Sequence, residues 1–272
     1  MTIKENKNLA RRIRAHTVRM TAAANASHVG TCLSMADILA ALYGECLQVD
    51  PKNPEWPARD RFVLSKGHGA AALYSVLAER GFFPLTWLRD FCADGASLTG
   101  HINSHGVPGV EVSTGALGHG LSIGCGLALA GRGAVESWRT VVLMSDGELD
   151  EGSTWEAILF AGHHRLDHLV AIVDYNGIQS FGRTSEVLDL EPLADKWRAC
   201  KWHVSQVNGH NIAEVIAAME DAKNNEGSPS VILAATIKGK GVSFMEDRLA
   251  WHYRSPRGDE LALALSELGA DD

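Results

Sequence analysis

Residues 140–176 read TVVLMSDGELDEGSTWEAILFAGHHRLDHLVAIVDYN and contain two short apolar runs, 140–146 and 168–176, separated by a helical pattern. Two similar runs follow at 202–210 (WHVSQVNGH) and 229–237 (PSVILAATI). Short apolar runs that alternate with helical segments are typical of β-α units, in which helices cover both faces of a parallel sheet. The sequence therefore predicts an α/β fold with a mostly parallel sheet and helices on both of its faces.

The first half of the chain is predicted to be mostly helical, because apolar residues recur there at helical spacing. Between the first two apolar runs, Ser153 and Glu156 form a capping-box pattern that predicts the start of a helix. The helices expected in the first half cover about Leu9–Ala24, Met35–Leu47, Gly69–Arg80 and Thr86–Ala93.

The composition describes an ordinary globular protein. The chain has 272 residues, of which 46 % are hydrophobic, and a formal charge of −8 from 25 Lys and Arg against 33 Asp and Glu. This excludes disordered and fibrous classes, and an acidic chain lacks the excess of cations that bulk binding to nucleic acid or anionic lipid requires. No repeat, low-complexity segment or linker divides the sequence, so residues 1–272 are expected to form a single domain.

The sequence also predicts where the protein resides. The weakly polar run Leu117–Ala130 is too short to cross a bilayer, and the charged residues 1–16 lack the apolar core of a signal peptide, so a cytoplasmic protein is expected. The cysteines are odd in number and widely spaced, with no C-x-x-C pair, which predicts buried free thiols rather than disulfides or a zinc site. They are Cys32, Cys46, Cys92, Cys125 and Cys200.

Glycine is concentrated between Gly115 and Gly133, where seven glycines occur within nineteen residues. Glycine destabilises a helix, so a helix that keeps many of them usually allows a close approach of another backbone or a ligand. Tight packing within the chain explains the pattern equally well from composition alone.

Polar residues follow the first two apolar runs, at Asp146 and Asn176. In an open parallel sheet, ligands bind outside the carboxyl ends of the strands. A carboxylate, an amide oxygen and a nearby backbone carbonyl are hard ligands of the kind that Mg²⁺ takes together with phosphate oxygens. Gly147 and Glu148 follow Asp146 and lead into a helix whose N-terminus favours an anion. These residues predict a metal and phosphate site.

The stretches from Ser145 to Glu148 and from Asp174 to Ile178 resemble the thiamine diphosphate motif, and Asp146 and Asn176 lie 30 positions apart, as in that motif. Further motifs are similar to those of transketolase. They resemble its N-terminal diphosphate-binding (PP) domain over almost the whole chain. These motifs are DRFVLSKGHGAAALYSVLAERGFF (60–83), GH (100–101), PGVEVSTGALGHGLSIGCGLALA (108–130), EGSTWEA (151–157), KGKGVSFMED (238–247) and WH (251–252).

This resemblance implies thiamine diphosphate and Mg²⁺, or Ca²⁺ or Mn²⁺ in its place, as cofactors. It implies that Asp146, Asn176 and the backbone carbonyl of Ile178 coordinate the metal. Histidines suit proton transfer near neutral pH, and the resemblance assigns three of them to the reacting carbon and the sugar hydroxyls. The catalytic candidates are His28, His68 and His101, and the cofactor-binding candidates are Gly115, Leu117, Gly147, Glu148, Asn176 and His252.

The resemblance covers only the first domain of a transketolase. The pyrimidine-binding and C-terminal domains, which carry the activating glutamate of the family, are expected on a separate partner chain, in an α2β2 heterotetramer. Glu151 and Glu156 are expected in a carboxylate cluster at the contact between chains. Tyr253 and Phe181 depart from the family pattern, so the resemblance does not identify the substrate.

The reaction implied is transfer of a two-carbon ketol unit from a ketose, such as a phosphorylated pentose-phosphate sugar, to an aldose. Transketolase-like chemistry on a specialised branched or sulfonated sugar is an alternative. Deoxyxylulose-phosphate synthase and a 2-oxo acid dehydrogenase-like subunit would share the metal-diphosphate site. A noncatalytic binding or regulatory subunit would retain only the fold.

Overall fold

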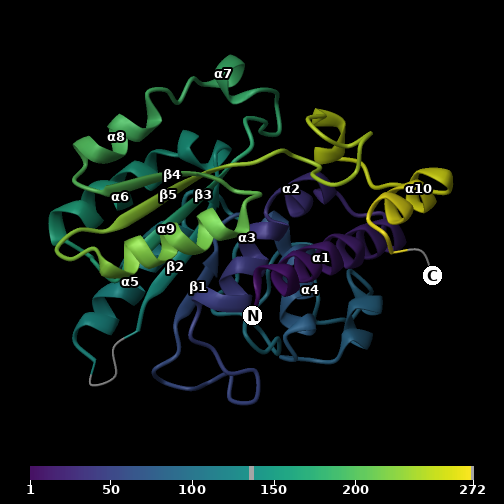
Figure 1. Cartoon of the computed structure of the whole chain (residues 1–272), viewed down its shortest axis with the longest axis horizontal. Coiled ribbons are helices and arrows are strands. Elements are labelled where there is room, and N and C mark those ends of the chain that lie inside the picture. The colour runs from purple at the N-terminus through teal and green to yellow at the C-terminus, as the bar shows by residue number, and fades with distance from the viewer. Residues whose placement is uncertain (135–137, 271–272) are drawn as a thin grey trace.

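One parallel sheet lies at the centre of the chain. The structure, a computed structural model, describes residues 1–134 and 138–270, so the last two residues of the domain expected over 1–272 lie outside it. Within these ranges five strands pair in the order β1-β2-β3-β5-β4, all parallel (Figure 1), which confirms the predicted α/β class. The strands are β1 (Arg61–Leu64), β2 (Thr140–Ser145), β3 (Leu169–Tyr175), β4 (His203–Asn208) and β5 (Ser230–Ala235).

Strand β1 was not predicted from periodicity. It has only four residues and occupies one edge of the sheet, where Phe62 pairs with Val141 and Leu64 with Leu143 of β2. An apolar run this short cannot be told from part of a helix by periodicity. Pairing with β2 therefore decides its conformation.

Helices surround the sheet. The helix predicted from Leu9 begins earlier, at Ile3, because Thr2 and Glu5 form a complete capping box there. The helix predicted over 35–47 is divided into shorter pieces. The helices are α1 (Ile3–Ala24), α2 (Val29–Ser34), α3 (Ala36–Ala41), α4 (Ala70–Glu79), α5 (Gly120–Arg132), α6 (Gly152–His164), α7 (Thr184–Val187), α8 (Leu193–Ala199), α9 (Ile212–Asn224) and α10 (Asp259–Glu267), with short helical turns η1 (Leu42–Cys46), η2 (Gly67–Gly69), η3 (Leu85–Asp90), η4 (Gly147–Asp150) and η5 (Leu249–His252).

The core has a layer on each side of the sheet. Side chains alternate along a strand, so Val141 and Leu143 of β2 face one layer while Val142 and Met144 face the other. Helices α1, α3, α4 and α9 supply the first layer, and α5, α6 and α8 supply the second (Figure 1). Helices on both faces leave the strand ends as the accessible parts of the sheet.

Two local predictions were wrong. Ser153 does not cap α6, because its hydroxyl donates to the carbonyl oxygen of Gly118 and the helix begins after Glu151. All five cysteines are free, but only Cys32 and Cys125 are buried, while Cys46 and Cys200 are half-buried and Cys92 is exposed. Within residues 1–134 and 138–270, no helix is both long enough and apolar enough to span a membrane.

Candidate functional site

A cavity of about 210 Å³ lies where the loops after β1, β2, β3 and β5 converge. We call it the histidine cavity. Every residue predicted for the site lines it, except Glu148. Its lining residues are His28, Thr31, His68, His101, Gly115, Leu117, Ser145, Asp146, Gly147, Asn176, Ile178, Gln179, Ser180, Lys238 and His252.

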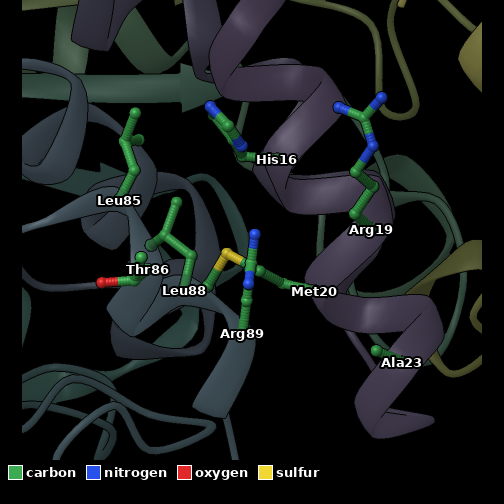
Figure 2. A pocket seen from close by; sticks show the side chains of 8 residues that line it. All are labelled: His16, Arg19, Met20, Ala23, Leu85, Thr86, Leu88 and Arg89. Carbon is green, nitrogen blue, oxygen red and sulfur yellow. The ribbon is translucent and has the colours of Figure 1, made fainter. Parts of the chain in front are cut away.

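Cavity size alone does not identify this site. A larger cavity of about 460 Å³ lies between α1 and η3 (Figure 2). Figure 2 shows His16 and Met20 on α1 facing Leu85 and Arg89 on η3, and its described lining contains no residue predicted for the site. The convergence of polar groups at strand ends therefore distinguishes the smaller cavity.

The candidate metal ligands follow two neighbouring strands. Asp146 comes directly after β2 and is 1 % exposed. Its Oδ1 accepts the N–H of Gly147 at 2.8 Å, and its Oδ2 accepts the N–H of Gly177 at 2.6 Å. The Oδ1 of Asn176 accepts the N–H of Ile178 at 3.1 Å. These bonds hold the carboxylate and the amide of the two loops beside each other.

This donor set fits a hard divalent cation. Carboxylate, amide and carbonyl oxygens are the ligands that Mg²⁺ and Ca²⁺ prefer. Burial, followed by the nearby Asp174 carboxylate, raises the pKa of Asp146, so a bound cation would stabilise its charged form. The described residues contain no group of three or more His, Cys, Asp and Glu side chains that could hold a metal.

Lys238 was missed as a site residue. Its ammonium lies in the cavity wall, donates to the carbonyl oxygen of Ile178 at 2.8 Å and lies 2.9 Å from His252 Nδ1. Burial, followed by the charge of Lys66, lowers the pKa of Lys238 to about 8. A lysine in a glycine-rich loop after an apolar strand was the available signal, because such a loop lies at the edge of the sheet where ligands bind.

A second buried lysine supports the floor of the site. The Lys66 ammonium pairs with the Asp174 carboxylate, and both side chains are completely buried. Asp174 also accepts the hydroxyls of Ser34, at 2.5 Å, and Thr236. Burial alone would raise the pKa of Asp174, but Lys66 and these hydroxyls lower it. This network joins the loop after β1 to the end of β3.

Four histidines from distant segments form one cluster. The ring of His28 lies 5.1 Å from that of His68, 5.6 Å from that of His101 and 5.0 Å from that of His252, centroid to centroid. Burial lowers the pKa of His28 to about 4 and that of His252 to about 3, with further lowering by neighbouring cationic groups. Burial also lowers the pKa of His68. These three imidazoles are neutral at pH 7.

The glycine-rich segment forms a wall of the cavity before it becomes helix α5. Gly115 packs against His101, whose Cδ2 would lie 3.2 Å from an added Cβ. Gly118 has a φ of +81°, and an added Cβ would lie 2.5 Å from the hydroxyl oxygen of Ser153. Close approach therefore explains these two glycines, and Leu117 lies on the cavity surface between them.

Glu148 lies behind this wall rather than in the cavity. It is fully buried, and its Oε1 accepts the Ser65 hydroxyl and, at 2.9 Å, the N–H of Gly118. Its Oε2 has no hydrogen-bond partner among the described residues. Burial is the main cause that raises its pKa. Glu151 and Glu156 are both exposed at the start of α6, away from the cavity lining.

Comparison with known proteins gives a consistent result. The family described as the transketolase thiamine diphosphate binding domain matches residues 5–272. The 6-deoxy-6-sulfo-D-fructose transketolase subunit SqwG of Clostridium sp. (strain MSTE9) is 46 % identical over 94 % of this chain and 93 % of its own length. An apulose-4-phosphate transketolase subunit of Actinobacillus succinogenes is 42 % identical over 98 % of this chain and 97 % of its own.

The solved structures agree on the fold. A transketolase from Campylobacter jejuni superposes on the whole chain with a TM-score of 0.92 and 33 % sequence identity. The chain spans 44 % of that transketolase. The chain therefore matches nearly the full length of relatives that are named as subunits, and less than half of the transketolase chain.

Proposed function

Because the chain belongs to the family of transketolase thiamine diphosphate-binding domains, we propose that it is the cofactor-binding subunit of a two-chain transketolase. The reaction proposed is reversible transfer of a two-carbon ketol unit from a ketose to an aldose. The observation that carries the proposal is the histidine cavity, which combines the oxygen ligands Asp146 and Asn176 with a cluster of neutral histidines.

In this proposal Asp146, Asn176 and the carbonyl of Ile178 hold Mg²⁺, and Gly147 and His252 contact the diphosphate. When bound, thiamine diphosphate would supply the nucleophilic carbon of the reaction and a place for the charge released on bond cleavage. Gly147 has no Cβ, and an added one would lie 2.8 Å from the Cβ of Gln179, so the loop after β2 packs closely against the loop after β3. Lys238 adds a cation to the same wall, which favours a diphosphate in an acidic protein.

The ring cluster supports a role in proton transfer. We assign His28, His68 and His101 to the donor and acceptor hydroxyls. A neutral imidazole has one nitrogen that donates and one that accepts, so it can hold a hydroxyl and receive its proton. The lowered pKa of His28 and His68 keeps that accepting nitrogen free at neutral pH. Gly115 and Leu117 are assigned to the wall that contacts the aminopyrimidine.

A partner chain with the pyrimidine-binding domain is part of the proposal. Its docking surface is assigned to the exposed face of α5 and α6, where Leu129, Leu159 and Phe160 are 39 %, 59 % and 40 % exposed. An apolar groove between these helices adjoins Gly126, where an added Cβ would meet nothing within 4 Å. Helix α5 begins at Gly120, soon after the wall residues Gly115 and Leu117, so one segment of the chain joins this face to the cavity wall.

The symmetric form proposed is α2β2, because closed two-fold assemblies are the commonest. Glu151 and Glu156 then fall near the contact between chains, and the assembly is proposed to act in the cytoplasm.

The donor is proposed to be an anionic sugar, either a pentose-phosphate ketose or a specialised one. The second choice is favoured by the two similar subunits, named for a sulfofructose and for apulose 4-phosphate.

The test is to purify the chain alone and together with a candidate partner that carries a pyrimidine-binding domain. Mg²⁺-dependent thiamine diphosphate binding and ketose consumption are then measured on the same samples. Turnover in the mixture alone supports a shared active site. Turnover by the lone chain overturns the need for a partner, and absence of cofactor binding in every sample supports the noncatalytic alternative.

A matched pair of variants tests the docking surface. Leu159→Asp introduces a charge on the exposed face of α6 and is expected to prevent co-purification while the melting temperature of the lone chain stays unchanged. Leu263→Asp makes the same change at a leucine that is 50 % exposed on α10 and is expected to leave association intact. Equal association of both variants would assign the partner to another face.

A further inference from the structure

A histidine outside the lining of the histidine cavity has both of its ring nitrogens engaged. His210 lies in the loop between β4 and α9, and its side chain is 13 % exposed. Its Nδ1 lies 2.9 Å from Oδ2 of Asp37 on α3, and its Nε2 accepts the N–H of Ile237 at 2.9 Å. The ring therefore joins α3 to residues 237–239, which carry Lys238 and which we call the Lys238 loop.

These two contacts fix the tautomer of the His210 ring. A backbone N–H can only donate, so the Nε2 that accepts from Ile237 carries no hydrogen. The one ring hydrogen of a neutral imidazole then lies on Nδ1 and is donated to Asp37. Burial opposes the charged form of Asp37, but the hydrogen bond from His210 and the charge of Arg14 lower the pKa of this carboxyl. Asp37 is therefore an ionised acceptor, which matches a hydrogen on Nδ1.

The ring of His210 is supported from behind. Arg14 of α1 donates to both carboxylate oxygens of Asp37, and each of these two residues is only 8 % exposed. Gly209 lets the loop lie close to the end of β5, because an added Cβ would lie 2.5 Å from Cγ2 of Thr236. A side chain held by packing and by fixed hydrogen-bond partners keeps one orientation and can position its neighbours.

The Lys238 loop is held by hydrogen bonds at three consecutive residues. The carbonyl oxygen of Lys238 accepts the N–H of Asp247 at 2.9 Å, and the N–H of Gly239 donates to a carbonyl oxygen of α2 at 2.8 Å. The third bond is the one from Ile237 to His210. Of these three bonds, only the third is made by a side chain. A substitution at His210 can therefore release one end of the loop without changing any residue that lines the cavity.

We propose that His210 is a positioning residue for Lys238: by holding the N–H of Ile237, it keeps the Lys238 ammonium at the wall of the histidine cavity. Lysine carries its charge at the end of a flexible stem, so the position of the ammonium depends on where its backbone is held. The attraction between the ammonium and a diphosphate decreases with distance, so a displaced loop binds the cofactor less tightly. This inference rests on the proposed function, since it concerns cofactor binding by that subunit.

Two amide side chains test the two ring nitrogens separately. The amide of asparagine has the length to replace Nδ1, and that of glutamine has the length to replace Nε2. His210→Asn therefore keeps a donor for Asp37 and removes the acceptor for Ile237, whereas His210→Gln keeps that acceptor. Titration calorimetry of the assembly with its partner measures Mg²⁺-dependent thiamine diphosphate binding. The affinity is expected to fall about tenfold in His210→Asn and to stay within about threefold in His210→Gln.

Two further comparisons separate positioning of Lys238 from a general effect on the fold. His203 of β4 also pairs with an aspartate, Asp221, at 2.6 Å, but these side chains are 36 % and 57 % exposed, so His203→Asn is expected to leave cofactor affinity unchanged. In a Lys238→Met background, His210→Asn is expected to change the affinity by less than about twofold, because no ammonium remains to be positioned. Equal loss in the presence and absence of Lys238 would overturn the proposal.

The wild-type chain alone provides a test that requires no substitution. Long-range proton–nitrogen correlation spectra distinguish the two neutral tautomers of a histidine ring. At pH 8 we expect the hydrogen of His210 on Nδ1, and we expect the Ile237 amide to be protected from hydrogen exchange. A hydrogen on Nε2, or an Ile237 amide that exchanges as fast as in an unstructured peptide, would overturn the proposal.

The positioning role and the proposed function fail in different ways. If the wild-type assembly binds no thiamine diphosphate, the proposed function fails, and acetylation of the lone chain decides the positioning role. Lys238 is 2 % exposed, so mass spectrometry is expected to show faster acetylation of its ammonium in His210→Asn than in the wild type or His210→Gln, and equal rates would reject the role. If the wild type binds the cofactor and His210→Asn binds it equally well, the proposed function stands and the positioning role is rejected.

Discussion

Asp146 accepts the backbone N–H of Gly177 at 2.6 Å, so the carboxylate that ends β2 is held by the loop that follows β3. The same loop carries Asn176 and Ile178. Because the two strands are adjacent and parallel, this hydrogen bond brings the candidate metal ligands together before any metal binds. The arrangement lowers the reorganisation that metal binding would require.

Replacing Asp146 tests the metal assignment. Asp146→Asn keeps the size of the side chain and one accepting oxygen but removes the charge. We expect Mg²⁺-dependent thiamine diphosphate affinity to fall at least about tenfold, because Mg²⁺ binds carboxylates more strongly than amides. Titration calorimetry of the chain with its partner measures this.

The matched control for that experiment is Asp195→Asn, whose side chain is 71 % exposed on α8. It is expected to bind cofactor as the wild type does. Removal of Mg²⁺ with EDTA is expected to reduce wild-type affinity to the level of the Asp146 variant. Unchanged affinity of Asp146→Asn at every Mg²⁺ concentration would remove Asp146 from the metal site.

The buried Lys66–Asp174 pair makes a prediction about stability. Lys66→Met leaves the Asp174 carboxylate buried without its cation, and breaking a buried pair in this way costs about 3–5 kcal/mol. Urea unfolding of the lone chain measures the change in free energy of unfolding. The double variant Lys66→Met/Asp174→Asn is expected to be more stable than the single variant, since no unpaired charge remains. A double variant less stable than Lys66→Met would contradict this explanation.

The lowered pKa of His28 predicts how the free energy of unfolding depends on pH. Its pKa is about 4 in the folded chain, against about 6.5 in an unfolded chain, so below pH 6.5 the unfolded state binds the proton more readily. Stability therefore falls as the pH decreases from about 6.5 towards 4, by up to about 3 kcal/mol for this group. Between pH 7 and 8 the His28 ring is neutral in both states, so it does not change the free energy of unfolding.

Urea unfolding at pH 7 and pH 5 checks this dependence. The wild type is expected to lose more stability between these values than His28→Gln, which cannot take up the proton. Proton NMR of the lone chain is expected to show no titration of the His28 ring between pH 6 and 8. A His28 inflection near pH 6.5 would mean that the ring is solvated rather than buried.

Glu148 tests how the cavity wall is held. Glu148→Ala removes the acceptor of the Gly118 N–H, and an unsatisfied buried donor costs about 1–3 kcal/mol. Glu148→Gln keeps an accepting oxygen and is neutral, and burial, which raises the pKa of Glu148, does not penalise a neutral side chain as it penalises a charge. Native-state hydrogen exchange at Gly118 is expected to accelerate in the alanine variant and not in the glutamine variant.

The control for the wall experiment is Glu156→Ala, an exposed substitution on α6 that is expected to leave Gly118 exchange unchanged. If Glu148→Ala and Glu148→Gln accelerate exchange equally, the charge of Glu148 and not its hydrogen bond supports the wall. Wild-type exchange in Glu148→Ala would show that the Ser153 hydroxyl bond to Gly118 is sufficient.

At several positions a contact with a distant segment outweighed the local preference that the sequence predicts. Ser153 had a capping pattern in the sequence, but its hydroxyl bonds to Gly118 of another segment. Glu148 stands next to Gly147 in the sequence, and yet it turns into the interior and not the cavity. Side-chain direction in a short helical turn depends on which partners pack against it, and neighbouring residues in the sequence do not contain that information.

The sequence by itself determined the parallel sheet and the position of Asp146 and Asn176 at the same edge of it. Apolar runs identify the strands, and the ends of parallel strands meet at one edge, so residues that follow successive strands are brought together by topology alone. It did not determine the short strand β1 or the buried Lys66–Asp174 pair. The positions of His28, His101 and His252 in one cluster also depend on tertiary packing, because segments far apart in the chain meet only when the loops around the sheet have packed.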